Sequence, residues 1–439
     1  MISSRRTFIA SGIGFGMAGT AAQAAVKLAG PVVLAANSGV DQTANLQAAI
    51  DDAAARGVPL ELPAGVFKTG ALTLRPGSVI SGVGRLTTLQ LTGGGAVFSG
   101  KACAGVSISR LTIDGGMHPL GAAAGLIVLE GCADLEISSV VVTNSSVNGI
   151  VITGSTGKVT GCTVLSVAQA GMFALDSTLS ISGNSVSGCG NNGVLVWRSK
   201  AGEDGSQVFN NAIAAIRADA GGTGENGNGI NVFRAGSVQV LGNRITDCAY
   251  SAIRGNAASN ISMTGNTCQR LGEVALYSEF GFQGAMIANN IVDGAATGIS
   301  VTNFNEGGRL GVVQGNLIRN LVRREQEPVD KRGEGIAVEA DTLVSGNTIE
   351  GAPTCGILLG WGRHMRDVSA TGNVVRGCRI GIMVSSDPGA GSALVSGNLI
   401  SGAIDGAIRA HDVGRAFGAD LAKGAPTTGR VTISGNSTG

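Results

Sequence analysis

Short segments in which apolar and polar residues alternate recur along most of the chain. The alternation is clearest at residues 179–182 (Leu-Ser-Ile-Ser) and 431–434 (Val-Thr-Ile-Ser). A period of two residues is typical of a β-strand that buries one face. A Gly-Asn pair or an equivalent pair follows these segments, and both residue types favour tight turns. The pattern therefore predicts many short strands joined by turns.

An asparagine recurs at the end of these segments, and its spacing defines a repeat. It stands at Asn184, Asn211, Asn243, Asn266, Asn290, Asn316, Asn347, Asn373, Asn398 and Asn436. The shortest intervals are 23 to 26 residues. A second motif of Gly, an apolar residue, any residue and an apolar residue follows the asparagine, as at residues 298–301, 335–338 and 381–384. Two or three short strands per repeat are therefore expected.

One such repeat cannot close a hydrophobic core, whereas stacked repeats can. Each strand then pairs in parallel with its copy in the next repeat, about 4.8 Å away, and the chain forms a β-solenoid. We expect the repeated asparagine to occupy a left-handed bend and to hydrogen-bond the asparagine of the next repeat through its amide.

Composition and charge narrow the class of protein further. Glycine accounts for 72 of 439 residues, which is too many for a helical protein, and no Gly-X-Y period points to collagen. The chain is 44% hydrophobic and 14% charged, so it does not resemble a disordered chain. The formal net charge of +1 gives no global field for nucleic acid or an anionic membrane.

The first residues resemble an export signal. Residues 4–9 (Ser-Arg-Arg-Thr-Phe-Ile) resemble the twin-arginine motif, and a weakly apolar Gly/Ala-rich stretch follows. Ala22 and Ala24 fit a signal-peptidase site, so residues 1–24 are expected to be a signal peptide. The resemblance implies the twin-arginine translocase as a partner during export and a periplasmic or secreted location. No later segment is long and apolar enough for a stable membrane span.

Cysteine and histidine placement gives no sign of a metal site. Of the eight cysteines, Cys189, Cys248 and Cys378 each follow a repeated asparagine by five residues, where other repeats have alanine. A position that accepts either residue is a small buried slot, so we expect mostly free, buried thiols, with pairing between stacked neighbours as the alternative. No Cys/His cluster has metal-ligand spacing, and no cofactor is expected.

Residues 41–89 carry a resemblance to a known superfamily. Residues 41–57 predict an amphipathic helix with Asp41 near its N-cap, Leu46 and Ile50 on one face, and Gly57 as its terminator. This helix and the strands after it resemble the N-terminal cap of right-handed parallel β-helix proteins of the pectate-lyase-like superfamily. The chain is thus identified as a twin-arginine-translocated repeat protein of that superfamily. Its fold is expected to be all-β, a right-handed parallel β-helix with an N-terminal capping helix, in which residues 35–100 form the cap and first turns and residues 101–439 the repeats.

Aligning the Gly-containing strands separates inward from outward positions. The first position after the glycine is apolar in every repeat, so it should face the core. The second position should face outward, and in the middle repeats it is polar: Asn231, Arg254, Tyr277 and Ser300. The fourth position gives a second outward ladder: Phe233, Asn256, Glu279, Thr302 and Glu339. The two ladders predict one polar patch.

Neighbouring segments are expected to frame this patch. The longest insertions before the strand, residues 214–228 and 319–334, should flank it as groove walls. The other rim would be formed by Arg198, Arg234, Asn303, Asn305 and Arg309. In pectate-lyase-like enzymes the equivalent face holds the sugar chain, so the resemblance implies a polysaccharide or oligosaccharide partner. The candidate substrate-binding residues are Asn231, Phe233, Arg234, Asn256 and Asn303.

Three readings of the patch remain open, with Glu279, Arg254, Tyr277 and Glu339 as candidate catalytic residues. Glu279 and Glu339 stand two repeats apart, within reach of the spacing used by inverting glycoside hydrolases. Alternatively, Arg254 or Tyr277 takes a proton beside a uronate that Arg234 neutralises, as in a lyase or epimerase. The Asp cluster of calcium-dependent lyases and the paired Asp and Gly-His-Gly pattern of polygalacturonases are absent.

The third reading is a face without chemistry, because an exposed strand is polar by default. The protein would then be a non-catalytic glycan-binding or cell-envelope scaffold. The three histidines rank below the patch. His118 lies in a turn, and His411 lies beside a predicted C-terminal cap at residues 413–423. His364 lies near Trp361, where the two could stack on a sugar, but we favour a decoration of the loop.

Overall fold

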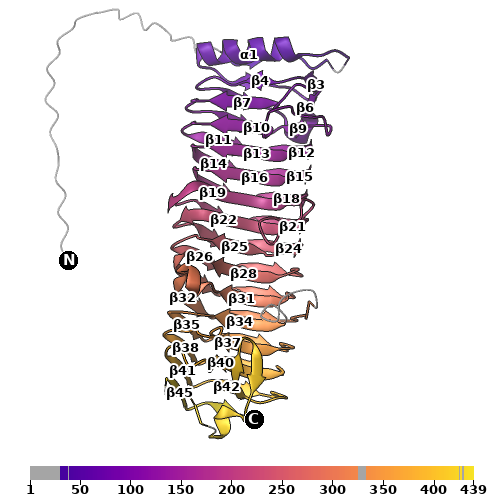
Figure 1. The fold of residues 1–439 in the computed structure, drawn as a ribbon. Helices are drawn as coiled ribbons and strands as arrows, with labels where there is room; N and C mark the ends of the chain where they lie inside the picture. The colour runs from indigo at the N-terminus through magenta and orange to yellow at the C-terminus, as the bar shows by residue number, and fades with distance from the viewer. Residues whose placement is uncertain (1–29, 38, 325–332, 425, 428–429) are drawn as a thin grey trace, which may run out of the picture. The chain divides into compact units, whose positions relative to one another are not determined.

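The computed structural model describes residues 30–37, 39–324, 333–424, 426–427 and 430–439. The twin-arginine motif and the cleavage site lie outside these residues, as do residues 325–332 of the second insertion. Residues 31–439 form one compact unit. It is a stack of parallel β-coils (Figure 1), as the asparagine repeat predicts.

Three parallel sheets run the length of the unit, and the chain visits them in turn. Sheet A contains β1 (Val32–Val33), β2 (Leu60–Glu61), β5 (Val79–Ser81), β8 (Ser107–Ser109), β11 (Leu135–Ser138), β14 (Thr156–Thr160), β17 (Thr178–Ser182), β20 (Gln207–Phe209), β23 (Gln239–Leu241), β26 (Ile261–Thr264), β29 (Gln283–Ala288), β32 (Arg309–Gln314), β35 (Thr342–Ser345), β38 (Val368–Thr371), β41 (Ala393–Ser396) and β45 (Val431–Ser434). Sheet B contains β3 (Gly65–Thr69), β6 (Thr87–Leu91), β9 (Thr112–Asp114), β12 (Val141–Ser145), β15 (Thr163–Val167), β18 (Ser185–Cys189), β21 (Ala212–Ile216), β24 (Arg244–Cys248), β27 (Thr267–Gln269), β30 (Ile291–Asp293), β33 (Leu317–Arg319), β36 (Thr348–Glu350), β39 (Val374–Arg376), β42 (Leu399–Ser401) and β46 (Ser437–Thr438). Sheet C contains β4 (Leu72–Thr73), β7 (Phe98–Lys101), β10 (Gly125–Glu130), β13 (Asn148–Thr153), β16 (Ala170–Leu175), β19 (Asn192–Glu203), β22 (Asn228–Gly236), β25 (Ile253–Asn256), β28 (Val274–Glu279), β31 (Thr297–Val301), β34 (Glu334–Val338), β37 (Cys355–Leu359), β40 (Ile380–Ser385), β43 (Ile408–Asp412) and β44 (Arg415–Phe417).

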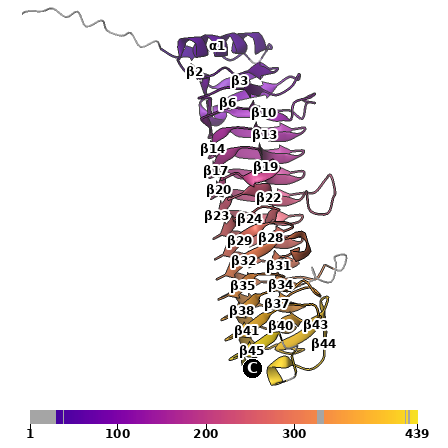
Figure 2. The ribbon, with the colours of Figure 1, turned by 60° about the vertical axis from the view of Figure 1, so that its left-hand side comes forward.

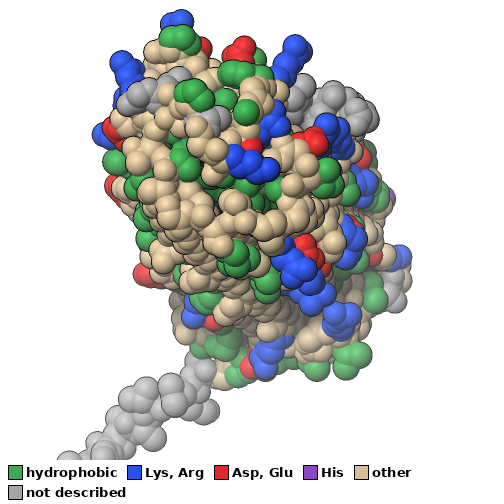
Figure 3. Space-filling model, turned by 90° about the horizontal axis from the view of Figure 1, so that it is seen from below, with side chains coloured by type: hydrophobic (Ala, Val, Ile, Leu, Met, Phe, Trp, Pro, Cys, Tyr) green, Lys and Arg blue, Asp and Glu red, His purple; other side chains and the backbone are tan. Residues whose placement is uncertain are grey.

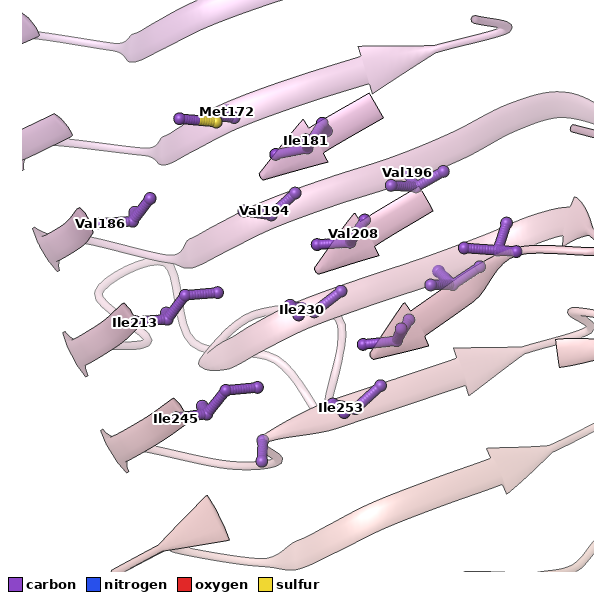
Figure 4. Close-up of a cluster of buried hydrophobic side chains, with 14 of the residues drawn as sticks. Met172, Ile181, Val186, Val194, Val196, Val208, Ile213, Ile230, Ile245 and Ile253 are labelled. Atoms are coloured by element: carbon purple, nitrogen blue, oxygen red, sulfur yellow. The ribbon is translucent and has the colours of Figure 1, made fainter. Parts of the chain in front are cut away.

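The core consists of inward-facing apolar ladders from all three sheets. Val194 and Ile230 occupy the first position after the glycine in successive strands of sheet C, and Ile253 occupies the same register position after Ala252. Each of the three is fully buried. In Figure 4 they lie beside inward side chains of the other two sheets, such as Ile181 and Ile213. The prediction that this position faces the core is confirmed.

The repeated asparagines form a buried ladder at the bend between sheets A and B. In one step of the ladder, Asn243 donates from its backbone N and from Nδ2 to Oδ1 of Asn266, at 2.9 and 3.0 Å. Asn266 then bonds Asn290 in the same way. The expected amide contacts are confirmed, but the expected left-handed conformation is wrong for these residues. The left-handed residue is the one before, such as Gly242 or Asn289, because the ladder asparagine must turn its amide inward.

A helix covers the first coil, as the sequence predicts. The helix α1 (Thr43–Arg56) buries Leu46 and Ile50 and ends at Gly57 in the left-handed conformation. Gln42 is the N-cap residue, and Asp41 accepts a hydrogen bond from the backbone N of Thr43 at 2.9 Å. Figure 2 shows α1 lying across the end of the stack. No helix among the described residues is long and apolar enough to cross a membrane.

The opposite end is closed by a hairpin and a short helix. Strands β43 and β44 pair antiparallel, whereas every other strand pair among the described residues is parallel. The 3₁₀ helix η4 (Leu421–Lys423) follows, so the predicted C-terminal cap lies where expected. Two further 3₁₀ helices are η1 (Gly84–Leu86) and η2 (Phe304–Glu306). All eight cysteines are free and buried. The expectation of free, buried thiols is confirmed, and the alternative of disulfides between stacked neighbours is wrong.

Candidate functional site

The two polar ladders predicted for sheet C are present in register. Asn231 pairs with Arg254, Arg254 with Tyr277, and Tyr277 with Ser300. In the second ladder Phe233 pairs with Asn256, and Asn256 pairs with Glu279. Thr302 and Glu339 continue it, because each follows directly after residues that pair between β31 and β34. Glu279 and Glu339 are therefore two coils apart, as the sequence predicts.

The first insertion, residues 214–228, covers the part of the polar patch around Arg254. The sequence predicts residues 214–228 as a wall beside an open patch, but their glycines let the loop approach the strands closely. A Cβ built on Gly224 would lie 1.6 Å from Nη1 of Arg254, so the guanidinium packs directly on this backbone. Tyr250 supports the loop by donating its hydroxyl to the carbonyl oxygen of Gly222 at 3.1 Å. Arg254 is consequently only 7% exposed.

Arg254 is the centre of a buried charge cluster. Its Nε lies 2.6 Å from Oε1 of Glu279, and its Nη1 lies 3.5 Å from Oε2 of Glu273. Asn256 donates to the same oxygen of Glu279 at 3.1 Å. The guanidinium also stands 5.0 Å from the ring centre of Tyr277. Burial alone lowers the pKa of Arg254, but the charges of Glu279 and Glu273 outweigh it and raise the pKa, so the guanidinium is held as a cation.

Aromatic side chains continue the face towards the N-terminal end. Trp197 contacts Phe173 and Phe233 edge to face, with ring centres 5.3 and 5.6 Å apart. Asn231 accepts a hydrogen bond from Nε1 of Trp197 at 3.1 Å. Arg234 stands over the ring of Phe233 at 4.6 Å. Three of the predicted binding residues, Asn231, Phe233 and Arg234, thus belong to a half-buried aromatic stripe.

A pocket of ≈ 300 Å³ opens on the same face, further towards the C-terminal end. Its described polar and aromatic lining comes from Tyr277, Thr297, Ser300, Thr302, Asn303, Asn305, Glu339, Trp361 and His364. We call it the Glu339 pocket. It gathers three predicted site residues, Tyr277, Asn303 and Glu339. The other predicted site residues (Arg254, Glu279, Asn231, Phe233, Arg234 and Asn256) do not line it.

The wall of the Glu339 pocket depends on η2 and on the loop after β37. Asn303 adopts a left-handed conformation and starts η2, which directs the backbone N of Phe304 to Oε2 of Glu339 at 2.5 Å. The Phe304 ring contacts His364 edge to face at 6.0 Å and lies under the guanidinium of Arg366 at 4.4 Å. These contacts hold Glu339 in a fixed position.

Trp361 and His364 also line the pocket, and neither belongs to the polar patch that the strand alternation predicts. They lie in the loop between β37 and β38 and exchange two backbone hydrogen bonds, at 3.2 and 3.0 Å. This closes a tight turn that places both rings at the pocket. A sequence signal was present, because Trp361 is one of only two tryptophans in the chain and stands between two glycines.

The described residues contain no group of three or more His, Cys, Asp or Glu side chains arranged to hold a metal ion. The Glu339 pocket combines a carboxylate with a phenol, an imidazole, an indole, hydroxyls and amides. Such a set can hydrogen-bond a polyhydroxylated ligand and exchange protons with it.

The repeats of the chain match a known protein family. The family model described as "Right handed beta helix region" matches residues 95–197, 148–320 and 202–380, which together cover more than half of the chain. No curated protein matches the chain in sequence.

Solved structures with a similar fold share little sequence with the chain. Pre-mature gene product 12 of bacteriophage phi29 has a TM-score of 0.50 and 15% identity, over 85% of this chain and 53% of that chain. Tailspike protein 2 from Escherichia coli O157:H7 bacteriophage CAB120 has a TM-score of 0.49 and 16% identity, over 72% and 42%. The catalytic unit of a GH87 α-1,3-glucanase from Streptomyces thermodiastaticus has a TM-score of 0.47 and 15% identity, over 94% and 69%. The chain thus spans about half or less of the two phage proteins, and the likeness to gene product 12 concerns the fold alone.

Proposed function

The chain belongs to the family of proteins with a right-handed β-helix region, and on that premise we propose that it is an exported protein that acts on polysaccharide. The saccharide lies along the outer face of sheet C, and one sugar unit occupies the Glu339 pocket. The protein works in the periplasm or outside the cell, after export by the twin-arginine translocase. The observation that carries the proposal is the convergence of Tyr277, Glu339 and Trp361 with two asparagines in one pocket.

The chemistry of this lining suits a sugar. A pyranose has an apolar face that packs on an aromatic ring and a rim of hydroxyls that need donors and acceptors. Trp361 supplies an aromatic surface, and Asn303 and Asn305 supply amides. The stripe of Phe173, Trp197 and Phe233 offers further aromatic surface on the same sheet, so a chain of several sugars can follow the coils.

Glu339 is the residue that we assign to proton transfer, with Tyr277 as its partner across the pocket. In hydrolysis, Glu279 would act as the second carboxylate. The two residues are two coils apart, about 9.6 Å between backbones at the usual strand spacing, and inverting hydrolases use carboxylates about 6.5–9.5 Å apart. In elimination or epimerisation, Tyr277 or Glu339 would take the proton next to a uronate carboxylate. Arg254 does not line the pocket and is engaged by Glu279 and Glu273, so the amides of Asn303 and Asn305 would bind that carboxylate.

A second candidate function is binding without turnover, as a glycan-binding or envelope scaffold protein. The ion pair between Glu279 and Arg254 favours it. Because Glu279 is only 2% exposed and is held at 2.6 Å from the guanidinium, Glu339 is the one carboxylate among the described residues that lines the pocket. A single carboxylate is sufficient for recognition of sugar hydroxyls, whereas hydrolysis ordinarily uses two.

Turnover and binding must be measured separately to test these proposals. The protein is incubated with neutral and acidic polysaccharides, and reducing ends and unsaturated products are scored independently. Retention on the same polysaccharides in affinity gels reports binding. Glu339→Gln keeps the shape of the side chain, and Glu350→Gln is the matched control, because Glu350 lies on sheet B in an exposed ion pair with Arg376.

The outcomes separate the candidates. New reducing ends that Glu339→Gln abolishes and Glu350→Gln preserves indicate hydrolysis, and unsaturated ends indicate elimination. Retention without products, weakened by Trp361→Ala, indicates the binding protein. A wild-type protein that neither retains nor alters any polysaccharide contradicts both.

A further inference from the structure

A second pocket lies on sheet C near the C-terminal end of the unit. Its volume is ≈ 410 Å³, and its floor includes Met383 and Arg409, which are paired in register on β40 and β43. Leu358, on the preceding strand, lines the Glu339 pocket and is paired with Met383. Leu358 and Met383 belong to a small outer apolar cluster with Trp361 and Ala416 packed against it. This cluster separates the two pockets.

Positive charge dominates the second pocket. Among the described residues, its lining contains three arginines, Arg323, Arg379 and Arg409, and one carboxylate, Asp405. The carboxylate is engaged by Arg379, with 2.5 Å between Nε and Oδ2. Within the described part of the chain, Arg323 and Arg409 form no ion pair with a carboxylate. Figure 3 views this end of the molecule and shows basic side chains interspersed with fewer acidic ones.

The two arginines outside the ion pair are held by neutral carbonyl groups. Nη2 of Arg323 donates to the backbone oxygen of Pro353 at 3.0 Å. Nη2 of Arg409 donates to the backbone oxygen of Gly418 at 2.7 Å, and its Nη1 donates to the backbone oxygen of Asp405. Nε of Arg409 is buried and has no hydrogen-bond partner among the described residues. A buried donor on a cation costs free energy unless an acceptor completes it.

Four separate segments of the chain contribute residues to the second pocket. Arg379 and Asp405 occupy equivalent turns just before β40 and β43, and the backbone N of Asp405 donates to the oxygen of Arg379 at 2.7 Å. Arg323 approaches from the segment after β33, and Ala416 closes the pocket from the terminal hairpin. The guanidinium groups are therefore positioned by backbone contacts and not by the long side chains alone.

We propose that this second pocket binds an oxyanion: a carboxylate, sulfate or phosphate group. A guanidinium matches the planar oxygen pairs of these groups and forms charge-assisted hydrogen bonds with them. An anion in the pocket would balance the excess positive charge of the described lining residues, of which only Arg379 is engaged by a carboxylate. The anion is either free in solution or the acidic group of a saccharide.

Titration calorimetry at constant ionic strength tests the proposal. Sodium sulfate, sodium phosphate and trigalacturonate are the probes, sodium chloride is the salt control, and fully methyl-esterified trigalacturonate is the uncharged control. We expect sulfate or trigalacturonate to bind wild-type protein and Arg323→Ala to weaken binding about tenfold, because one charge-assisted contact is lost. Arg323 is exposed, so its replacement leaves the fold intact.

Two further variants test whether the loss of anion binding is specific to arginines of the second pocket. Arg379→Ala should weaken binding by a similar factor, whereas Arg376→Ala, which removes an exposed arginine on β39 outside the pocket, should not. Tighter binding of trigalacturonate than of sulfate, with no binding of the ester, identifies a saccharide acid as the ligand, and the reverse order identifies a free anion. Absence of binding by all three anions, or equal binding by wild type and both pocket variants, overturns the proposal. Glu339→Gln should leave anion binding unchanged, so the result is independent of the first pocket.

Discussion

His411 provides a pH-dependent test of how the C-terminal end is held together. Its side chain is fully buried on β43. Nδ1 accepts a hydrogen bond from the backbone N of Gly414 at 3.1 Å, and Nε2 lies 3.2 Å from the backbone oxygen of Leu359. A neutral imidazole with its proton on Nε2 satisfies both contacts, and protonation of Nδ1 would break the first. Burial lowers the pKa of His411 to about 4, while the Leu359 carbonyl and the Asp412 carboxylate raise it to a smaller extent.

The lowered pKa of His411 determines how the stability of the fold changes with pH. The folded-state pKa of about 4 lies below the unfolded value of 6.5. Above pH 6.5 the histidine is neutral in both states, and the full stability is present. As the pH falls from 6.5 to 4, the unfolded chain takes up a proton that the folded chain refuses, so stability is lost over this window. At about 1.4 kcal/mol per unit of pKa, the loss reaches about 3 kcal/mol.

Histidine titration by NMR measures the pKa directly, since the chain has only three histidines. His411→Asn identifies the signal and removes the titrating group. We expect the His411 signal to titrate near pH 4. The unfolding temperature of wild type should fall more steeply than that of His411→Asn between pH 6.5 and 4. A His411 midpoint near 6.5, or identical pH dependence of the two proteins, would refute the buried neutral imidazole.

Three further predictions concern the ladder, the charge cluster and export. Asn266→Leu removes four hydrogen bonds and orphans the backbone N of Asn243, so it should destabilise the unit by about 3 kcal/mol in denaturant unfolding; Asn436→Ala, at the end of the ladder, should cost less. Arg254→Met should cost about 3–5 kcal/mol, because it removes the cation that balances the buried carboxylate of Glu279; an unchanged unfolding temperature would contradict the cluster. Lysines in place of both arginines at positions 5 and 6 should block export of a reporter fused to residues 1–30; normal export would exclude the twin-arginine route.

The fold is predictable because its signals are local and repeated. The apolar residue after each glycine and the asparagine at each bend recur often enough to fix the strand register without any long-range information. The conformation of the bend is less accessible, because both Gly and Asn favour the left-handed region. Only the ladder contacts show that Gly242 and not Asn243 adopts it.

The site is less predictable because loops decide which ladder residues reach solvent. Alternation places Arg254 and Glu279 on the outer face correctly, but it carries no information about the loop that folds over them. The contact of Gly224 with the Arg254 guanidinium depends on the path of a glycine-rich insertion. Trp361 likewise reaches the Glu339 pocket through a turn outside the repeat.

A crystal structure of Glu339→Gln with an oligosaccharide of the polysaccharide that the protein retains most strongly would show whether a saccharide occupies the Glu339 pocket. We expect one sugar unit in the Glu339 pocket, within hydrogen-bond distance of Asn303 or Asn305 and against Trp361, and further units along the outer face of sheet C. An oligosaccharide bound on sheet A or sheet B, with the Glu339 pocket free of sugar, would contradict it.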